Sequence, residues 1–185
     1  MVFPPYRNLT TSRLFLRKIT LSDRESYFRL FSSPEIARYM NWEPHTHIEQ
    51  TDTALEKLMG RYETGKCYRW GITLSGSQDL IGIFELLDFN FQDSTCSFAY
   101  MVSPEHWNRG YGSEALMAAM DFAFGEMEMA VITACHMGPN LASGAAMKKA
   151  GMQFDRAIPG VFRKNGETFD RILYRITREE WVNRG

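Results

Sequence analysis

The residues best suited to ligand chemistry lie in one short segment just past the middle of the chain. Residues 107–115 contain Gly110 and Gly112 and separate a strand-like run from an apolar, helix-like run. A strand that turns through Gly-x-Gly into a helix directs unpaired backbone N–H groups, and the positive end of the helix dipole, toward one point. Glycine lets the backbone approach a ligand closely, and Arg109 can add a charge-assisted hydrogen bond. The segment therefore predicts a phosphate-binding turn.

The spacing of this segment does not match two common phosphate-binding motifs. A dinucleotide-binding GxGxxG needs a third glycine, but Gly112 is followed by Ser113, Glu114 and Ala115. A P-loop needs Gly-Lys-Ser/Thr after its spacer, and this segment lacks that sequence. A nicotinamide-dependent oxidoreductase is therefore disfavoured. Taken alone, the glycine pair is also compatible with a plain tight turn.

The hydrophobic pattern predicts the elements that would position the turn. In the first half, residues 14–19 predict a strand, and a capping box from Ser22 to Glu25 predicts a helix that Pro34 ends. Later strands and helices are expected at residues 48–62, 70–74, 80–89, 95–102, 115–124, 130–135, 140–150, 154–161 and 169–176. The total is about seven strands and four helices, alternating in the second half, which is typical of an α/β fold.

The composition predicts a single domain over residues 1–185 that acts in the cytoplasm. The 21 basic and 22 acidic side chains leave a formal net charge of -1, so no overall field favours nucleic acid or a membrane surface. The chain has no apolar run of about 18 residues, and residues 1–11 lack the features of a signal peptide. Its three cysteines and four histidines show no metal-ligand spacing, so no metal is expected.

Residues 103–115 read Ser-Pro-Glu-His-Trp-Asn-Arg-Gly-Tyr-Gly-Ser-Glu-Ala. They resemble the signature motif of the GNAT acetyltransferase superfamily, in particular its branch that acetylates the N-termini of ribosomal proteins. Residues 9–14 resemble that branch's start, 80–82 its third strand, 140–152 its second cofactor motif and 170–174 its closing strand. The resemblance covers nearly the whole chain. It implies a GNAT fold, a mixed and strongly twisted sheet whose fourth and fifth strands splay apart.

The resemblance also implies which residues hold acetyl-coenzyme A, the acetyl donor. Contacts with the pantetheine arm and the reacting carbonyl are implied for Tyr100, Met101 and Val102. Contacts with the pyrophosphate are implied for Trp107, Asn108, Arg109, Gly110, Tyr111, Gly112 and Ser113. Asn140 would contact the cofactor, and the Ser143 hydroxyl would assist the departing thiolate. From the residues alone, Asn140 also suits a helix N-cap and Ser143 a first-turn position.

The general base is not identified by these motifs. Many relatives carry a glutamate on the fourth strand in the pattern E-x-G-Y, where this chain has serine at position 97 and keeps Tyr100. Glu85, on the preceding strand, is expected to replace it as a catalytic residue and to contact the substrate, and a solvent-facing strand position is its alternative. Trp42 is expected to bind the acceptor, with simple packing as its alternative.

The missing acid also bears on the acceptor. A protein α-amine, with a pKa of about 7.7–8.0, is roughly one-fifth neutral near pH 7, whereas a lysine side chain, with a pKa of about 10.4, is almost wholly charged. A site without a strong base therefore favours direct attack by a protein N-terminus, such as that of a ribosomal protein. A polyamine, amino acid or antibiotic amine is an alternative acceptor, and a non-catalytic coenzyme A-binding module is an alternative function. The family resemblance is also compatible with a homodimer.

Overall fold

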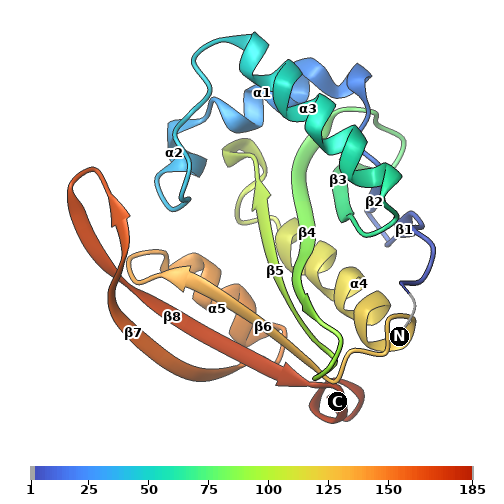
Figure 1. Cartoon of the computed structure of the whole chain (residues 1–185), viewed down its shortest axis with the longest axis vertical. Coiled ribbons are helices and arrows are strands. Elements are labelled where there is room, and N and C mark those ends of the chain that lie inside the picture. Colours follow the sequence, from blue (N-terminus) through green and yellow to red (C-terminus); the bar gives the residue numbers. More distant parts are fainter. Residues whose placement is uncertain (1–2, 185) are drawn as a thin grey trace.

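The computed structural model describes residues 3–184 and folds them around one mixed, twisted sheet (Figure 1). Within that range the sheet has eight strands in the order β1-β2-β3-β4-β5-β6-β8-β7, and all neighbours are antiparallel except the parallel pair β5 and β6. The strand bounds are β1 Leu9–Thr10, β2 Leu14–Arg17, β3 Tyr68–Leu74, β4 Leu80–Asn90, β5 Thr95–Val102, β6 Val131–Met137, β7 Gln153–Lys164 and β8 Glu167–Thr177.

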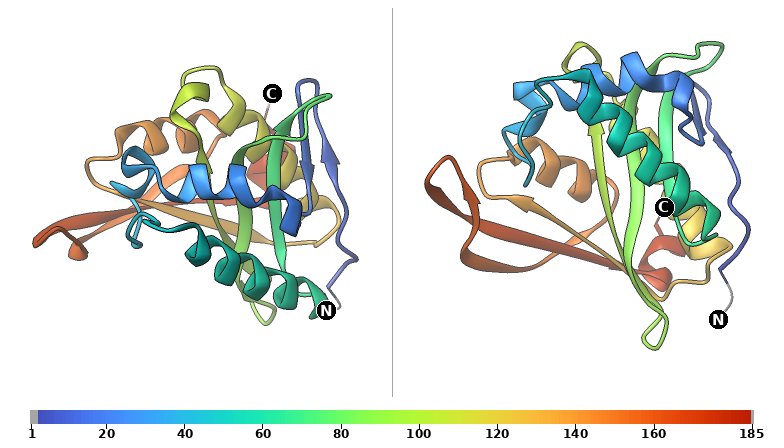
Figure 2. Two further views of the ribbon diagram at one scale, coloured as in Figure 1. Left: turned by 90° about the horizontal axis from the view of Figure 1, so that it is seen from above. Right: turned by 45° about the horizontal axis from the view of Figure 1, so that its top comes forward.

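Helices cover both faces of this sheet. In Figure 2, α1 and α3 lie over one face of β3 to β5, and α4 lies over the opposite face. The bounds are α1 Arg24–Phe31, α2 Pro34–Ala37, α3 Ile48–Glu63, α4 Tyr111–Gly125, α5 Leu141–Lys149 and α6 Arg178–Val182, with short 3-10 helices η1 at Leu21–Asp23 and η2 at Pro104–His106. None of the helices in the described range is long and apolar enough to cross a membrane.

The side chains of the central strands contribute to two apolar cores, one on each face of the sheet. Phe84 and Phe98 pack with Phe122 of α4, whereas Ile83 and Met101 belong to the core under α1 and α3. Successive strand residues point to opposite faces, so a strand buried on both sides is apolar along most of its length. This burial explains the nearly continuous apolar run in the first seven residues of β4.

The strands β5 and β6 pair over only three residues each and then separate. Thr95 to Ser97 pair with Val131 to Thr133, while the remaining residues of both strands have no partner across this boundary in the described structure. Figure 1 shows the two strands diverging away from the end at which they pair. The predicted α/β GNAT fold with a splayed sheet is therefore confirmed, with eight strands and six α-helices in the described range instead of about seven and four.

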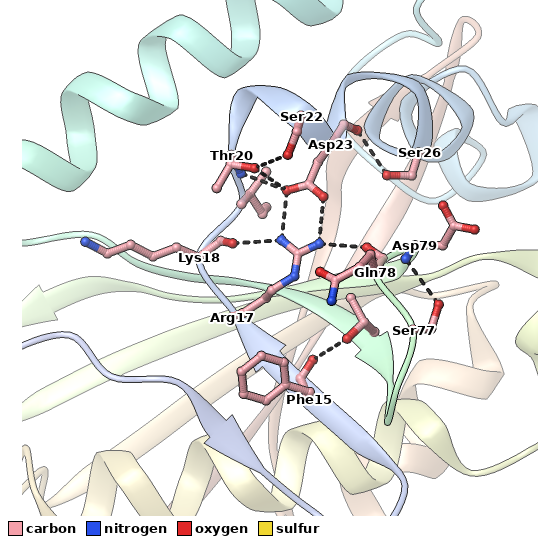
Figure 3. A network of polar contacts seen from close by, with 12 residues as sticks. Phe15, Arg17, Lys18, Thr20, Ser22, Asp23, Ser26, Ser77, Gln78 and Asp79 are labelled. Carbon is pink, nitrogen blue, oxygen red and sulfur yellow. Dashed lines mark hydrogen bonds and ion pairs between the residues drawn. The ribbon is translucent and has the colours of Figure 1, made fainter.

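The first helix begins differently from the sequence prediction. The capping box is formed by Thr20 and Asp23, not by Ser22 and Glu25, and it precedes η1. The Asp23 carboxylate accepts from the Thr20 backbone N–H at 2.7 Å and from both terminal nitrogens of Arg17 at 2.7 and 2.9 Å (Figure 3). Asp23 is only 5% exposed, and burying its carboxylate without a cation would cost folding free energy. The ion pair with Arg17 therefore stabilises the cap at Asp23.

Other differences arise where short elements depend on tertiary contacts. Pro34 does end α1, as predicted, but it also begins α2, for which the Ser33 hydroxyl accepts from the Ile36 N–H at 3.3 Å. Proline suits the first helical position because its missing N–H is not needed there. The short elements β1 and α6 were not predicted, because two to five residues give too little periodicity to read.

The tip of the β7–β8 hairpin reaches the loop that follows α2. The Lys164 ammonium donates to the Trp42 carbonyl at 2.7 Å and to the Glu43 carboxylate at 2.6 Å. The Lys164 side chain is 8% exposed and that of Glu43 is 75% exposed, so the lysine is buried whereas its carboxylate partner faces water. It joins the C-terminal hairpin to the segment predicted to meet the acceptor.

Candidate functional site

The splay between β5 and β6 opens into a cavity of about 630 Å³. Its walls come from the end of β5, the turn before α4, the first turns of α4 and α5, and the α2 region. The lining residues are Glu35, Ile36, Tyr39, Met40, Tyr100, Met101, Val102, His106, Trp107, Asn108, Gly110, Tyr111, Gly112, Ser113, Pro139, Asn140, Leu141, Ala142, Ser143, Ala145, Ala146 and Lys149. This donor cleft brings together all the residues predicted to bind the cofactor except Arg109.

The start of α4 has the geometry of an anion site. Asn108 and Gly110 adopt left-handed conformations with φ of 60° and 81°, which turn the chain sharply into the helix. The first intrahelical bond runs from the Glu114 N–H to the Gly110 carbonyl at 3.0 Å, which leaves the preceding N–H groups of the first turn for other partners. Those groups and the helix dipole face the donor cleft, which suits a diphosphate.

Arg109 does not line the donor cleft, and its backbone has a different role. The Arg109 carbonyl accepts from the Arg13 guanidinium at 3.0 Å, and Arg13 also lies over the Tyr111 ring at 4.7 Å. The Glu114 carboxylate accepts from Arg13 Nε at 2.7 Å and from the Thr11 hydroxyl at 2.5 Å. This contact set fixes the turn from behind. Sequence reasoning missed it, because residues a hundred positions apart give no local signal.

The free edge of β5 presents backbone groups to the donor cleft. The Ser103 N–H donates to the Ile81 carbonyl at 2.7 Å, so the alternation of antiparallel pairing directs the backbone of Met101 toward β4 and that of Tyr100 and Val102 toward the gap. The Val102 carbonyl already accepts from the Trp107 indole N–H at 2.7 Å. The N–H groups of Tyr100 and Val102 are therefore the donors that a carbonyl oxygen in the gap would meet.

Asn140 and Ser143 lie on the opposite wall, at the start of α5. The Asn140 side-chain oxygen caps the helix by accepting from the Ser143 N–H at 3.3 Å, as its alternative interpretation predicted. Burial raises the pKa of the Tyr100 hydroxyl, and a hydrogen bond with Ser143 partly offsets that effect. Two hydroxyl groups thus face each other across the donor cleft, and both remain protonated near neutral pH.

A second cavity of about 350 Å³ lies under α1 and α3 and is lined by Trp42. We call it the α3 pocket; its other lining residues are Tyr27, Phe31, His45, Ala54, Lys57, Leu58, Arg61 and Arg69. Trp42 packs against Phe31 with ring centroids 4.9 Å apart. Burial lowers the pKa of His45, whose Nδ1 lies 2.9 Å from the Thr51 hydroxyl oxygen.

Glu85 is not free to act in the manner expected from the sequence. Its carboxylate is buried, with 7% exposure, and does not line the donor cleft. One oxygen accepts from Arg61 at 2.6 Å, and the other accepts from Arg69 Nε at 2.8 Å. Both carboxylate oxygens are therefore already engaged in ion pairs. The geometry therefore makes Glu85 an ion-pair partner at the floor of the α3 pocket rather than an available base.

A different carboxylate lies beside the fourth-strand position that lacks an acid. The Ser97 hydroxyl donates to the Asp88 carboxylate at 2.5 Å. Asp88 has a φ of 52° at an irregularity in the pairing of β4 with β5, which turns it toward Ser97. The strand pattern alone gave no indication of this approach, because a regular strand would have kept the two side chains in their own rows.

Comparisons with known proteins agree with this architecture. The model of the acetyltransferase (GNAT) domain family matches residues 13–153. An uncharacterised N-acetyltransferase of Bacillus subtilis is 29% identical over 170 residues, covering 92% of this chain and 96% of its own. A ribosomal-protein-S5-alanine acetyltransferase of Vibrio fischeri has a TM-score of 0.83 at 16% identity, covering 95% and 99% of the two chains.

A spermidine N-acetyltransferase of Vibrio cholerae, solved with coenzyme A and spermine, has a TM-score of 0.82 at 20% identity. The alignment covers 94% of this chain and 100% of that one. At such identities the two solved structures establish the fold alone, whereas the family match spans most of the chain and includes the turn at Gly110. The chain belongs to the GNAT family of acetyltransferases, enzymes that take their acetyl group from acetyl-coenzyme A.

Proposed function

We propose that the enzyme acetylates the N-terminal α-amine of a protein, such as a ribosomal protein, in the cytoplasm. The observation that carries this proposal is the chemistry of the donor cleft. Among the described residues that line it, Glu35 is the one carboxylate, and hydrogen bonds from its own backbone and from Ser33 lower its pKa. An acceptor that is already partly neutral at pH 7 needs no strong base, and an α-amine meets that condition.

The cofactor-binding roles belong to the same proposal. The first turn of α4 would hold the pyrophosphate, and the free edge of β5 would accompany the pantetheine arm. As the amine nitrogen attacks the thioester carbon, the N–H of Tyr100 or Val102 would donate to the carbonyl oxygen that gains negative charge. Such preorganised donors are worth about 3–4 kcal/mol in transition states of this kind.

The departing sulfur would be met by hydroxyl groups. When the tetrahedral intermediate collapses, the carbon–sulfur bond breaks and the thiolate receives the proton of the Ser143 hydroxyl, which Tyr100 adjoins. The Ser143 hydroxyl takes a proton from water at the same time, so Ser143 stays neutral. The attacking nitrogen loses one proton to water or to the Asp88 carboxylate reached through water. The charges balance, because the amine loses one proton, the thiolate gains one through Ser143, and Ser143 returns to its neutral hydroxyl.

The test is release of coenzyme A thiol with a panel of acceptors that includes N-terminal peptides, their N-blocked forms, lysine-containing blocked peptides and spermidine. The proposal expects turnover with free α-amines. Ser143→Ala should lower kcat about 100-fold with little change in KM for the peptide, as expected for loss of a positioned acid. Turnover with spermidine or lysine side chains but not with α-amines would contradict the proposed acceptor. Binding without release from any amine would support the non-catalytic alternative.

A further inference from the structure

The α3 pocket combines aromatic walls with an excess of positive charge. Phe31 stacks on Tyr27 at 4.3 Å and on His45 at 5.3 Å, so one side of the pocket is a continuous aromatic surface. The lining also carries three cations, Lys57, Arg61 and Arg69. The donor cleft lies between β5 and α5, so this pocket is a separate feature that the acetyl donor does not explain.

One carboxylate neutralises only part of this charge. Glu85 accepts from both Arg61 and Arg69, which leaves the three cations and one anion with a net charge of about +2. Arg69 is held firmly, because it also donates to the Tyr27 hydroxyl at 3.4 Å and its side chain is 21% exposed. Arg69 and Glu85 therefore form a fixed floor.

The donors available to a ligand come from the two cations on α3. Arg61 uses Nη2 for Glu85 and is 50% exposed, so its other nitrogens remain accessible. Lys57 is exposed and makes no ion pair with any other described residue. The two residues are four positions apart on a helix, so they lie on the same face and can bind one anion together. A planar carboxylate matches such donors well.

The floor of the α3 pocket is close to the reacting edge of β5. Glu85 pairs directly with Ala99, and Met101 is its diagonal neighbour on the same face of the sheet. Diagonal neighbours across an antiparallel pair are about 7–8 Å apart. Arg61 lies a further 2.6 Å beyond the Glu85 carboxylate. An extended peptide spans about 3.3 Å per residue, so a carboxylate about three residues from the attacking amine would reach Arg61.

We propose that the α3 pocket selects an acceptor by binding its carboxylate between Lys57 and Arg61. This inference rests on the proposed function and narrows it: the α-amine belongs to a molecule with a carboxylate within about three residues of it. That carboxylate is an acidic side chain near a protein N-terminus or the terminal carboxylate of a short peptide or amino acid. A polyamine is disfavoured, because its ammonium groups would meet a cationic pocket.

The experiment compares matched acceptors in the thiol-release assay. The acceptors are an N-terminal peptide with aspartate at its second or third position, the same peptide with asparagine, a dipeptide with a free or amidated C-terminus, and spermidine. Lys57→Gln is compared with Lys66→Gln, an exposed lysine after α3 that does not line the pocket. Lys57→Gln should raise KM about tenfold for carboxylate-bearing acceptors only, a change that equals about 1.4 kcal/mol. Added salt should raise KM for the same carboxylate-bearing acceptors, because salt screens their attraction to the cations.

The results separate this inference from the proposed function. Equal kcat/KM for the aspartate and asparagine peptides, or an equal loss for both in Lys57→Gln, would overturn the carboxylate site while α-amine transfer stands. The free and amidated dipeptides show which source of the carboxylate the pocket accepts. If no peptide releases thiol, calorimetric binding of the aspartate peptide decides: binding that Lys57→Gln weakens keeps the site and overturns the proposed acceptor, and absence of binding overturns both.

Discussion

Replacing Gly112 by alanine tests whether the start of α4 and the Tyr100 ring form the cofactor site together. A Cβ built at Gly112 would lie 3.0 Å from Tyr100 Cε2 and 3.6 Å from Val102 Cγ2. Both neighbours line the donor cleft, so the ring or the helix start must move by a few tenths of an ångström. Overpacking of this kind costs about 1–3 kcal/mol, while alanine recovers about 0.5–1 kcal/mol of helix propensity. The unfolding free energy should therefore fall by no more than about 2.5 kcal/mol.

Cofactor binding should change more specifically. Hydrogen bonds to charged groups contribute about 1.5–3 kcal/mol each, so misplacing one N–H of the first turn should weaken acetyl-coenzyme A about tenfold. The assay is calorimetric titration of acetyl-coenzyme A, together with melting temperatures with and without it. At 100 times the wild-type Kd, the ligand should stabilise the wild-type enzyme by about 2.7 kcal/mol and the variant by about 1.4 kcal/mol.

The matched control makes the same change at Gly125, the last residue of α4. A Cβ there would have no atom within 4 Å, so Gly125→Ala should bind acetyl-coenzyme A like the wild-type enzyme. The reasoning would be refuted by wild-type affinity in Gly112→Ala. It would also be refuted if both variants lost affinity equally, because the effect would then come from the helix as a whole.

Four further predictions concern stability. A Cβ at Gly144 would lie 2.7 Å from Nε2 of the buried His136, so Gly144→Ala should lower the unfolding free energy by about 1–3 kcal/mol. Gly60→Ala in α3, where a Cβ has free space, should raise it by up to about 1 kcal/mol; urea denaturation of the two variants checks both signs. Glu85→Gln removes the buried carboxylate that pairs with two arginines and should lower the unfolding free energy by about 3 kcal/mol. This value is the low end of the range for breaking a buried ion pair, because Arg61 is half exposed. An unchanged melting temperature would contradict the described ion pairs. Burial lowers the pKa of His45 in the folded state below its unfolded value of about 6.5. As the pH falls below 6.5, the unfolded state binds a proton more readily than the folded state. The folded state therefore loses stability until the pH has fallen through the folded pKa. Melting temperatures from pH 7.5 to 5 should fall more steeply for the wild-type enzyme than for His45→Gln, and parallel curves would argue against this assignment.

Much of the fold was predictable because its longer elements carry strong periodic patterns. The predicted strand at residues 95–102 coincides with β5, and the predicted helix at residues 140–150 contains α5. The Gly-x-Gly turn was also readable, because its two glycines precede an apolar helix. The positions of α2 and of the first capping box could not be predicted as well. Several residues close together in the sequence can act as N-caps, and tertiary contacts decide which of them does.

The roles expected for individual site residues divide in the same way. Eleven of the residues that the family resemblance implied as cofactor contacts line one cleft, at the end of β5, in the turn before α4 and at the starts of α4 and α5. Arg109 and Glu85 do not fit their expected places, because side-chain direction and ion pairing depend on neighbours distant in the sequence. Arg13 and Lys57 were not recognised as site neighbours for the same reason.

Motifs spread along the chain were enough to predict the family, and local periodicity was enough to predict the order of the main elements and the turn into α4. The contacts around that turn emerge only in three dimensions: Arg13 and Glu114 lie behind it, and the free N–H groups of β5 lie beside it. The same holds for the cationic α3 pocket, which is separate from the turn. Such contacts join residues from separate strands and helices. Their energies are set by burial and by charges brought together in space, and no pattern along the chain records these quantities.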